Sequence, residues 1–389
     1  MNMRSLFILA AMTPVIAFAD PSQDLLKAVK SHDIAAMKTA IAAGADVNTK
    51  DEGGNTPLNC AIWWPDEVKL LIESKADVNL HQPLSSAATW GETESLNLLL
   101  KAGANVNEKN PLGQSALWLA AFNGCQSSAL SALIAAGAEV DAKDLQGMTP
   151  LFVLASNGAT PAERVAKIKT QGPFLEKAGL KLSERLVNPK ESDYSSIDDM
   201  MTVLINAKAD VNVVMEKTHM TPMIWAAKHN RPDAIIALVK AKADVNVASR
   251  TGWTALCYAA DNIKNTEAAK ALIANGADVN VILNWVSLRQ KNGKMATGDE
   301  ELGGKDTKQG LKGVSVLMLA AKEGNVELTK ALIEAKANVN VICTGNVGLG
   351  EGYSAKTKQT AATIAHSFEH EDVFAVLVKA GAKSIDDLE

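Results

Sequence analysis

Residues 366–370 read His-Ser-Phe-Glu-His, which is the spacing H-x-x-E-H of an inverted zinc-protease signature. Two histidines four residues apart can face one metal ion. Only 19 residues follow His370, however, which leaves no room for the distal glutamate ligand of such enzymes. The other histidines, at positions 32, 81, 219 and 229, show no metal-ligand spacing, and no serine lies on a nucleophile elbow. We therefore assign no catalytic or metal-ligating residue.

Two other patterns could carry chemistry. The glycine-rich run 345–352 lacks the Gly-Lys-Ser/Thr ending of a phosphate loop and follows no β-α unit, so we expect no nucleotide and no other cofactor there. The cysteines contain no C-x-x-C pair and lie far apart, so we expect no disulfide. Cys60 and Cys257 lie in apolar helical contexts, where a buried free thiol is the usual outcome.

The first 19 residues have the composition of a secretory signal peptide. Residues 1–4 carry a positive charge, 5–18 are apolar and uncharged, and Ala17 and Ala19 fit the positions that a signal peptidase reads. The apolar run is too short for a spanning helix, and no later stretch is long enough to cross a membrane. We expect an exported mature chain that begins near Asp20 and lies in a bacterial periplasm or is fully secreted.

A five-residue phrase recurs along the rest of the chain and predicts the elements that position everything else. It reads Gly-Ala-Asp-Val-Asn at residues 44–48 and returns in variant forms from residues 75, 103, 137, 208, 242, 276 and 336, ending in a truncated copy at 381–383. Several intervals are 34 residues, a period that indicates a solenoid of stacked units. Such units bind other molecules with their surface.

Residues 113–137 form the clearest unit. Ser115 has the character of a helix N-cap, and apolar residues follow at the i, i+3, i+4 spacing of a buried helix face. Gly124 ends this first helix and Gly137 ends a second one. About eight turn-forming residues then lead to the next Ser or Thr, which predicts a projecting loop.

This unit resembles the ankyrin repeat, whose phrase Thr-Pro-Leu-His-x-Ala is later followed by Gly-Ala-Asp-Val-Asn. The first phrase stands as Thr-Pro-Leu-Asn-Cys-Ala at 56–61, Thr-Pro-Leu at 149–151 and Thr-Pro-Met-Ile-Trp-Ala at 221–226. The family's His is absent from every copy, and Lys replaces the helix-ending Gly at 75, 208, 242 and 336. The resemblance implies an all-α ankyrin-repeat solenoid of helix-turn-helix units with projecting β-hairpin loops. It implies about nine units over residues 20–389, after a signal peptide at 1–19.

Three insertions interrupt the array, near 159–195, 281–312 and 341–357. The last two lengthen consecutive hairpin loops, so they should meet on one edge of the solenoid. They either carry recognition or are tolerated surface insertions. The first lies inside a unit and is either an insertion or a degenerate tenth repeat; we expect it to protrude from the turn edge, away from the other two.

The resemblance also implies where a partner binds, because contact positions in this family are the hairpin tip, the residue before the capping Thr, and two residues after the first helix's Ala-Ala pair. These positions predict a partner-binding surface that contains Trp63, Trp64, Trp90, Phe122, Asn123, Leu112, Gln114, Met148, Arg250 and Trp253, with Leu145 at another contact position. Aromatic rings recur in three adjacent units and would form a strip on the concave side. Alternatively, these rings fill space left by two shortened units. Trp118 and Trp225 are expected in the core.

We therefore expect a non-enzymatic protein–protein interaction scaffold or adaptor that acts outside the cytoplasm, through its concave face and enlarged hairpins. The alternative is an accessory factor whose loop insertions hold a small ligand or cofactor for a periplasmic enzyme. An enzyme centred on His366 is the least favoured reading. The net charge of −5, with Lys and Arg spread along the chain, argues against a nucleic-acid partner.

Overall fold

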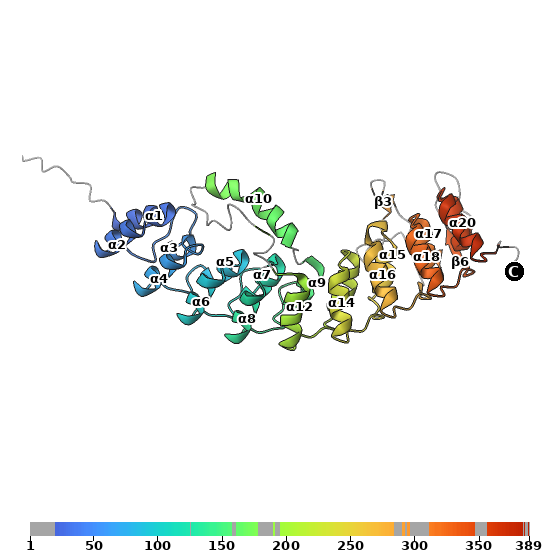
Figure 1. The fold of residues 1–389 in the computed structure, drawn as a ribbon, viewed down its shortest axis with the longest axis horizontal. Coiled ribbons are helices and arrows are strands. Elements are labelled where there is room, and N and C mark those ends of the chain that lie inside the picture. Colours follow the sequence, from blue (N-terminus) through green and yellow to red (C-terminus); the bar gives the residue numbers. More distant parts are fainter. Residues whose placement is uncertain are drawn as a thin grey trace, which may run out of the picture.

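The computed structural model describes residues 20–124, 126–157, 161–177, 190, 195–283, 290–291, 294–295, 311–346, 356–383, 385 and 388. In these residues, paired helices follow one another along a shallow arc (Figure 1). The predicted signal peptide, residues 1–19, and parts of the three insertions lie outside the described residues. None of the described helices is long and apolar enough to span a membrane.

Each unit is a pair of helices, of which we call the first the inner helix and the second the outer helix. The pairs are α1 (Pro21–Ser31) with α2 (Ile34–Ala42), α3 (Pro57–Cys60) with α4 (Pro65–Glu73), α5 (Pro83–Trp90) with α6 (Thr93–Lys101), α7 (Ala116–Asn123) with α8 (Ser127–Ala135), α9 (Pro150–Asn157) with α12 (Ile197–Asn206), α13 (Pro222–Lys228) with α14 (Pro232–Lys240), α15 (Ala255–Ala260) with α16 (Thr266–Ala274), α17 (Val316–Lys322) with α18 (Val326–Glu334), and α19 (Ala361–Ser367) with α20 (Glu371–Lys379). A short 3-10 helix, Ile263–Asn265, precedes α16. Consecutive inner helices pack on each other, which confirms the predicted all-α solenoid.

The inner helices begin where the sequence predicts. The Ser115 hydroxyl accepts a hydrogen bond from the backbone N–H of Trp118 at 3.2 Å, and Thr149 and Thr221 cap their helices in the same way. Small residues such as Ala120 and Ala121 are fully buried where inner helices meet. Close stacking of thin helices therefore explains the high alanine content of this chain.

The helix-ending lysines adopt the backbone conformation of the glycines that they replace. Lys75, Lys208, Lys242 and Lys336 have φ angles of 68°, 70°, 63° and 69°, in the left-handed region that glycine occupies in the other units. Each of these lysines therefore carries a steric cost of about 1 kcal/mol, partly offset by a cation near a helix C-terminus.

A row of hydrogen bonds joins each unit to the next, and we call it the amide row. The side-chain oxygen of the phrase's last residue accepts the backbone N–H of the third residue of the next phrase. The pairs are Asn48 with Asp77, Asn79 with Asn105, Asn107 with Glu139, Asp141 with Asp210, Asn212 with Asp244, Asn246 with Asp278, Asn280 with Asn338, and Asn340 with Lys383, all at 2.8–3.1 Å. The recurring asparagine therefore sets the spacing of the units.

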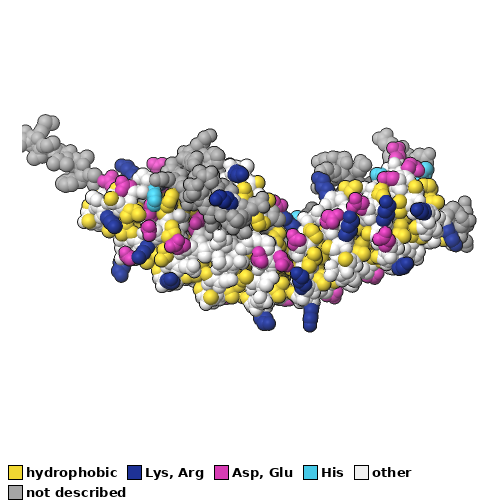
Figure 2. Space-filling model, viewed as in Figure 1, with side chains coloured by type: hydrophobic (Ala, Val, Ile, Leu, Met, Phe, Trp, Pro, Cys, Tyr) yellow, Lys and Arg dark blue, Asp and Glu magenta, His cyan; other side chains and the backbone are white. Residues whose placement is uncertain are grey.

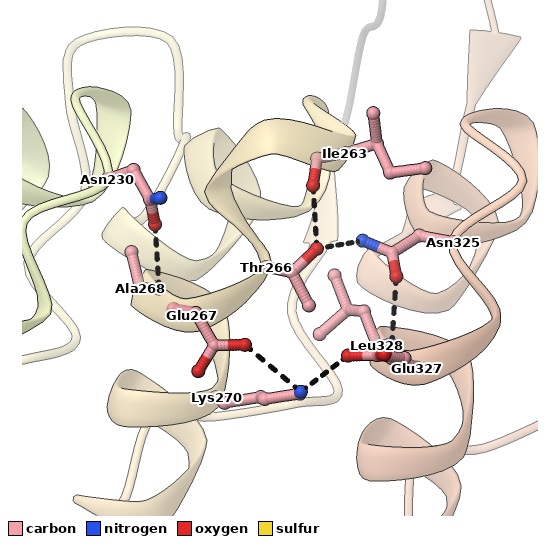
Figure 3. A network of polar contacts seen from close by, with 9 residues as sticks. All are labelled: Asn230, Ile263, Thr266, Glu267, Ala268, Lys270, Asn325, Glu327 and Leu328. Atoms are coloured by element: carbon pink, nitrogen blue, oxygen red, sulfur yellow. Dashed lines mark hydrogen bonds and ion pairs between the residues drawn. The ribbon is translucent and has the colours of Figure 1, made fainter.

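Polar contacts also join units at the other end of the outer helices, as Figure 3 shows for α16 and α18. Asn325 caps α18 by accepting the N–H of Leu328 at 3.0 Å, and its Nδ2 donates to Thr266 Oγ1 of the preceding unit at 2.7 Å. Asn230 of the unit before accepts the N–H of Ala268 at 3.1 Å. Hydrogen bonds thus join these neighbouring units at both ends of their outer helices.

Short strands join the two enlarged hairpins. Strand β1 (Ile282–Leu283) pairs with β5 (Val314–Ser315), and β2 (Gln290–Lys291) pairs with β3 (Lys294–Met295). An antiparallel sheet in the order β4-β6-β7 links β4 (Leu311–Lys312) of the first hairpin to β6 (Cys343–Asn346) and β7 (Lys356–Gln359) of the second. This pairing confirms the prediction that the two insertions meet on one edge.

The insertion near 159–195 corrects the sequence analysis. Its described part is one helix, α10 (Pro161–Lys177), which extends over the inner helices (Figure 1). The segment does not protrude from the turn edge as predicted but folds back over it, because Ile168 of α10 packs against Ile62 and Trp63 in the turn between α3 and α4. The apolar spacing at Val165 and Ile168 was visible in the sequence, but not the surface that it covers.

Replacing Lys208 by Gly should raise the free energy of unfolding by about 1 kcal/mol, because glycine adopts a positive φ without steric cost. Urea denaturation followed by circular dichroism measures the change. Lys330→Gly is the matched control: this exposed lysine lies inside α18, where glycine should cost about 1 kcal/mol. A Lys208→Gly chain less stable than the wild type would contradict the assignment.

Candidate functional site

Aromatic side chains of the second and third units come together in the turn that follows α3 and at the end of α5. Ile62, Trp63, Trp64 and Trp90 form a group that we call the aromatic cluster. Trp63 meets Trp90 edge to face, with ring centroids 5.9 Å apart. Trp64 stacks on His32 of the first unit, with centroids 3.7 Å apart. Three of the predicted contact residues therefore share one surface.

Helix α10 covers the aromatic cluster. Ile168 is only 1% exposed and Val165 packs beside it, while Trp63 is left 6% exposed. On the opposite side of α10, residues such as Ala166 and Lys169 are exposed. The contact has the form of an amphipathic helix bound in an apolar groove, with the chain supplying its own helix.

Arg164 of α10 is almost completely buried, at 1% exposure. Its guanidinium donates to the carbonyl oxygen of Thr89 at 2.8 Å and to Asn123 Oδ1 at 3.4 Å. The guanidinium carbon lies 5.8 Å from the centre of the Trp90 ring, within the range of a cation–π contact. Two neighbouring units thus build a receptor for one arginine.

Phe122 and Asn123 lie beside this contact at the end of α7. Phe122 is half-buried and stacks on Trp118, with centroids 5.2 Å apart. Asn123 is buried, and its Nδ2 donates to the carbonyl of Leu119 at 2.9 Å while its oxygen receives Arg164. Trp118 is buried, as predicted, whereas Trp225 is only partly buried against the core.

Two adjacent hairpin tips expose leucine. Leu112 is 59% exposed and Leu145 is 77% exposed, which makes Leu145 the most exposed large apolar side chain among the described residues. The N–H of Leu145 donates to the carbonyl of Leu112 at 3.1 Å. Between them, Gly113 has a φ of 78°, and a Cβ atom there would lie 2.9 Å from the Leu145 nitrogen. The close contact fixes the two tips side by side.

The remaining predicted contact residues divide into exposed and internal ones. Arg250 is exposed at another tip, and its guanidinium donates to the carbonyl of Glu216 at 2.9 Å. Gln114 is half-buried and accepts a hydrogen bond from Asn110 at 2.9 Å. Met148 and Trp253 are buried in the core cluster. The structure therefore leaves Leu112 and Arg250 accessible from this group, and brings Met148 and Trp253 inside.

A buried ion pair in the C-terminal units escaped the sequence analysis. Lys322 Nζ lies 2.7 Å from Asp261 Oδ1 and 3.1 Å from Glu323 Oε1, and the side chains of Lys322 and Asp261 are 7% and 6% exposed. Burial opposes the charge of Lys322, but the two carboxylates outweigh it and raise its pKa above the ordinary value. The sequence does contain a signal for this ion pair, because opposite charges stand at equivalent positions of neighbouring units.

The histidines of the H-x-x-E-H segment contact different groups. His366 Nδ1 bonds to Glu371 Oε1 at 2.9 Å, and His370 Nε2 donates to the carbonyl of Lys322 at 3.1 Å. Within the part of the chain that the structure describes, no three His, Cys, Asp or Glu side chains are placed to hold one metal ion.

The described cysteines are buried free thiols. This confirms the expectation for Cys60 and Cys257, and Cys343 behaves in the same way. Burial raises the pKa of the Cys60 and Cys343 thiols to about 11, so both are protonated near neutral pH. Cys125 lies outside the described residues.

On the face that Figure 2 shows, basic and acidic side chains are interspersed along the whole length.

Comparison with known families gives matches along most of the array. The family model described as "Ankyrin repeats (3 copies)" matches residues 25–110, 84–167 and 193–282. The model described as "Ankyrin repeat" matches residues 312–344. The matches leave out much of the insertion that carries α10 and most of both enlarged hairpins. No curated protein matches this chain.

Proposed function

This chain belongs to the ankyrin repeat family, and we propose that it binds another protein outside the cytoplasm through the exposed tips of its hairpins. Ankyrin repeats mediate protein–protein binding, and proteins built from them are typically non-enzymatic scaffolds. The observation that carries the proposal is the exposed pair Leu112 and Leu145 on adjacent tips. These are the two most exposed large apolar side chains among the described residues, whereas α10 covers the aromatic cluster.

Apolar area is the first reason why the tips suit a partner. A leucine that becomes fully buried contributes roughly 1.5–3 kcal/mol. Leu112 and Leu145 are both more than half exposed, so much of that gain remains for a partner. Adjacent exposed apolar side chains mark a candidate surface for protein interaction.

Rigidity is the second reason. Asn110 Oδ1 accepts the N–H of Leu112 at 2.9 Å, and Asp144 Oδ1 accepts those of Gln146 and Met148, both at 2.9 Å. These side chains hold both tip turns in one conformation. Little ordering entropy is then lost on binding, so a small apolar contact can give useful affinity.

Export is supported by the composition of residues 1–19, with their charged start, apolar run and small residues before Asp20. Mass spectrometry of the chain isolated from source cells should therefore find Asp20 as the first residue. A cytoplasmic chain that retains Met1 would contradict this part of the proposal.

Substituting Leu112→Ser and Leu145→Ser together should reduce recovery of the partner at least about tenfold, because the apolar area that the partner would bury is lost. The measurement is a pull-down from the exported fraction of source cells, with circular dichroism to check the fold. The matched control is Ile236→Ser with Val378→Ser, which changes two exposed apolar residues of the outer helices. Unchanged recovery with the tip variant, or an equal loss with the control, would contradict the tip site.

A further inference from the structure

We propose that the aromatic cluster is a second binding site, which accepts an arginine-bearing amphipathic helix of another protein, and that α10 is the internal occupant which this helix displaces. The proposal rests on the proposed function only in treating the chain as a protein-binding scaffold. It concerns a different surface from the hairpin tips. The kind of partner follows from α10, because this helix shows what the site binds.

The described part of α10 contacts the array with one face. Arg164 and Ile168 are buried, and Pro161 and Val165 are half-buried, which is the i, i+3, i+4, i+7 pattern of a helix lying in a groove. Ala162, Glu163 and Ala166, which lie between these positions, are exposed. The site thus recognises about two helical turns, with an arginine, an aliphatic residue directly after it and another four positions after it.

The arginine position is the selective part of the site. Thr89 offers a carbonyl oxygen, Asn123 offers an amide oxygen and Trp90 offers a ring face to one guanidinium. A planar fork of N–H donors can serve these acceptors while stacking on the ring, and a lysine ammonium cannot match that geometry. We therefore expect the displacing helix to carry arginine at this position.

The repeats pack on each other without the help of α10, so this helix can detach while the repeats stay folded. Helices α9 and α12 on either side of the insertion pack on each other as one unit. The amide row also continues across the insertion, from Asp141 to Asp210 at 3.1 Å. One described contact joins α10 to the later units: Arg231 donates to both carboxylate oxygens of Glu163, at 3.1 and 3.3 Å, and the Glu163 side chain is 51% exposed, so solvent weakens this ion pair.

The fit of α10 is also incomplete. The indole Nε1–H of Trp63 is buried and has no hydrogen-bond acceptor among the described residues. A buried donor without a partner is unfavourable, and a ligand that supplies an acceptor removes that penalty. A partner helix with a glutamate or glutamine beside Trp63 would thus bind better than α10 does.

The affinity that a competing helix needs depends on the fact that α10 and the site belong to the same chain. A helix that belongs to the same chain as its site competes at an effective concentration on the order of mM, so a free copy at 10 μM occupies only about 1% of sites. A natural partner overcomes this by the extra hydrogen bond to Trp63, or by contacting Leu112 and Leu145 as well. The site is therefore selective for a partner that binds more tightly than α10.

The test uses the full chain and a fluorescein-labelled peptide with the sequence of residues 161–177. In the variant Arg164→Glu with Ile168→Asp, α10 should detach, because a reversed charge and a buried carboxylate oppose its binding. Fluorescence anisotropy should show saturable peptide binding to this variant, with a Kd at least about tenfold lower than for the wild-type chain. A peptide carrying the same two substitutions should not bind.

Adding Trp63→Ala and Trp90→Ala to the variant should abolish peptide binding, whereas adding Val378→Ser should not. If the charged variant unfolds, Ile168→Ala, which only removes methyl groups, provides the same comparison. Equal peptide binding to wild type and variant, binding that survives loss of the two tryptophans, or no binding at 1 mM to a folded variant would each overturn the proposal. Peptide binding that persists in the Leu112→Ser, Leu145→Ser chain separates this site from the tip site.

Discussion

The rest of the structure depends on the amide row, in which a backbone N–H of each unit donates to the side-chain oxygen of the last phrase residue in the preceding unit. A two-helix unit cannot bury its apolar face alone, so the units have to stack. Apolar contacts alone would allow neighbouring units to slide past each other. A side-chain oxygen that accepts one particular backbone N–H fixes the spacing between units, as Asn246 Oδ1 does when it accepts the N–H of Asp278 at 2.9 Å. The result is the arc of stacked helix pairs that Figure 1 shows.

The N-terminal and C-terminal halves of the array shield the side chains near the ends of their inner helices from water in different ways. In the N-terminal half the aromatic cluster would expose large rings, and α10 covers them. In the C-terminal half, Lys322 and Asp261 occupy the corresponding positions and neutralise each other. The hairpin tips are left as the accessible contact surface, with Leu112 and Leu145 fixed side by side. This distribution of exposed and buried side chains is the reason why we propose that a partner first contacts the hairpin tips.

Periodic features could be predicted from the sequence because they depend on local chemistry. The helix caps, the left-handed lysines such as Lys208, and the meeting of the two enlarged hairpins all follow from residue type and spacing. The position of α10 could not be predicted, because its apolar face shows that it packs somewhere without showing where. The missed signal was Arg164, a charged residue within that apolar spacing, which only a polar receptor such as Thr89 and Asn123 can accommodate. Whether the predicted contact residues bind a partner is a question of function that local patterns do not decide.

Amide hydrogen exchange of the unmodified chain tests the central claim most directly, since it measures the opening of α10 and of the array in one sample. We expect the amides of the row, such as those of Asp244 and Asp278, to exchange only as the array unfolds. The amides of α10 should exchange at least about tenfold faster, but more slowly than an unfolded peptide, through a local opening. Exchange of α10 at the rate of the row would show that it is an inseparable part of the fold. Exchange at the rate of an unfolded peptide would show that it does not occupy the aromatic cluster in solution.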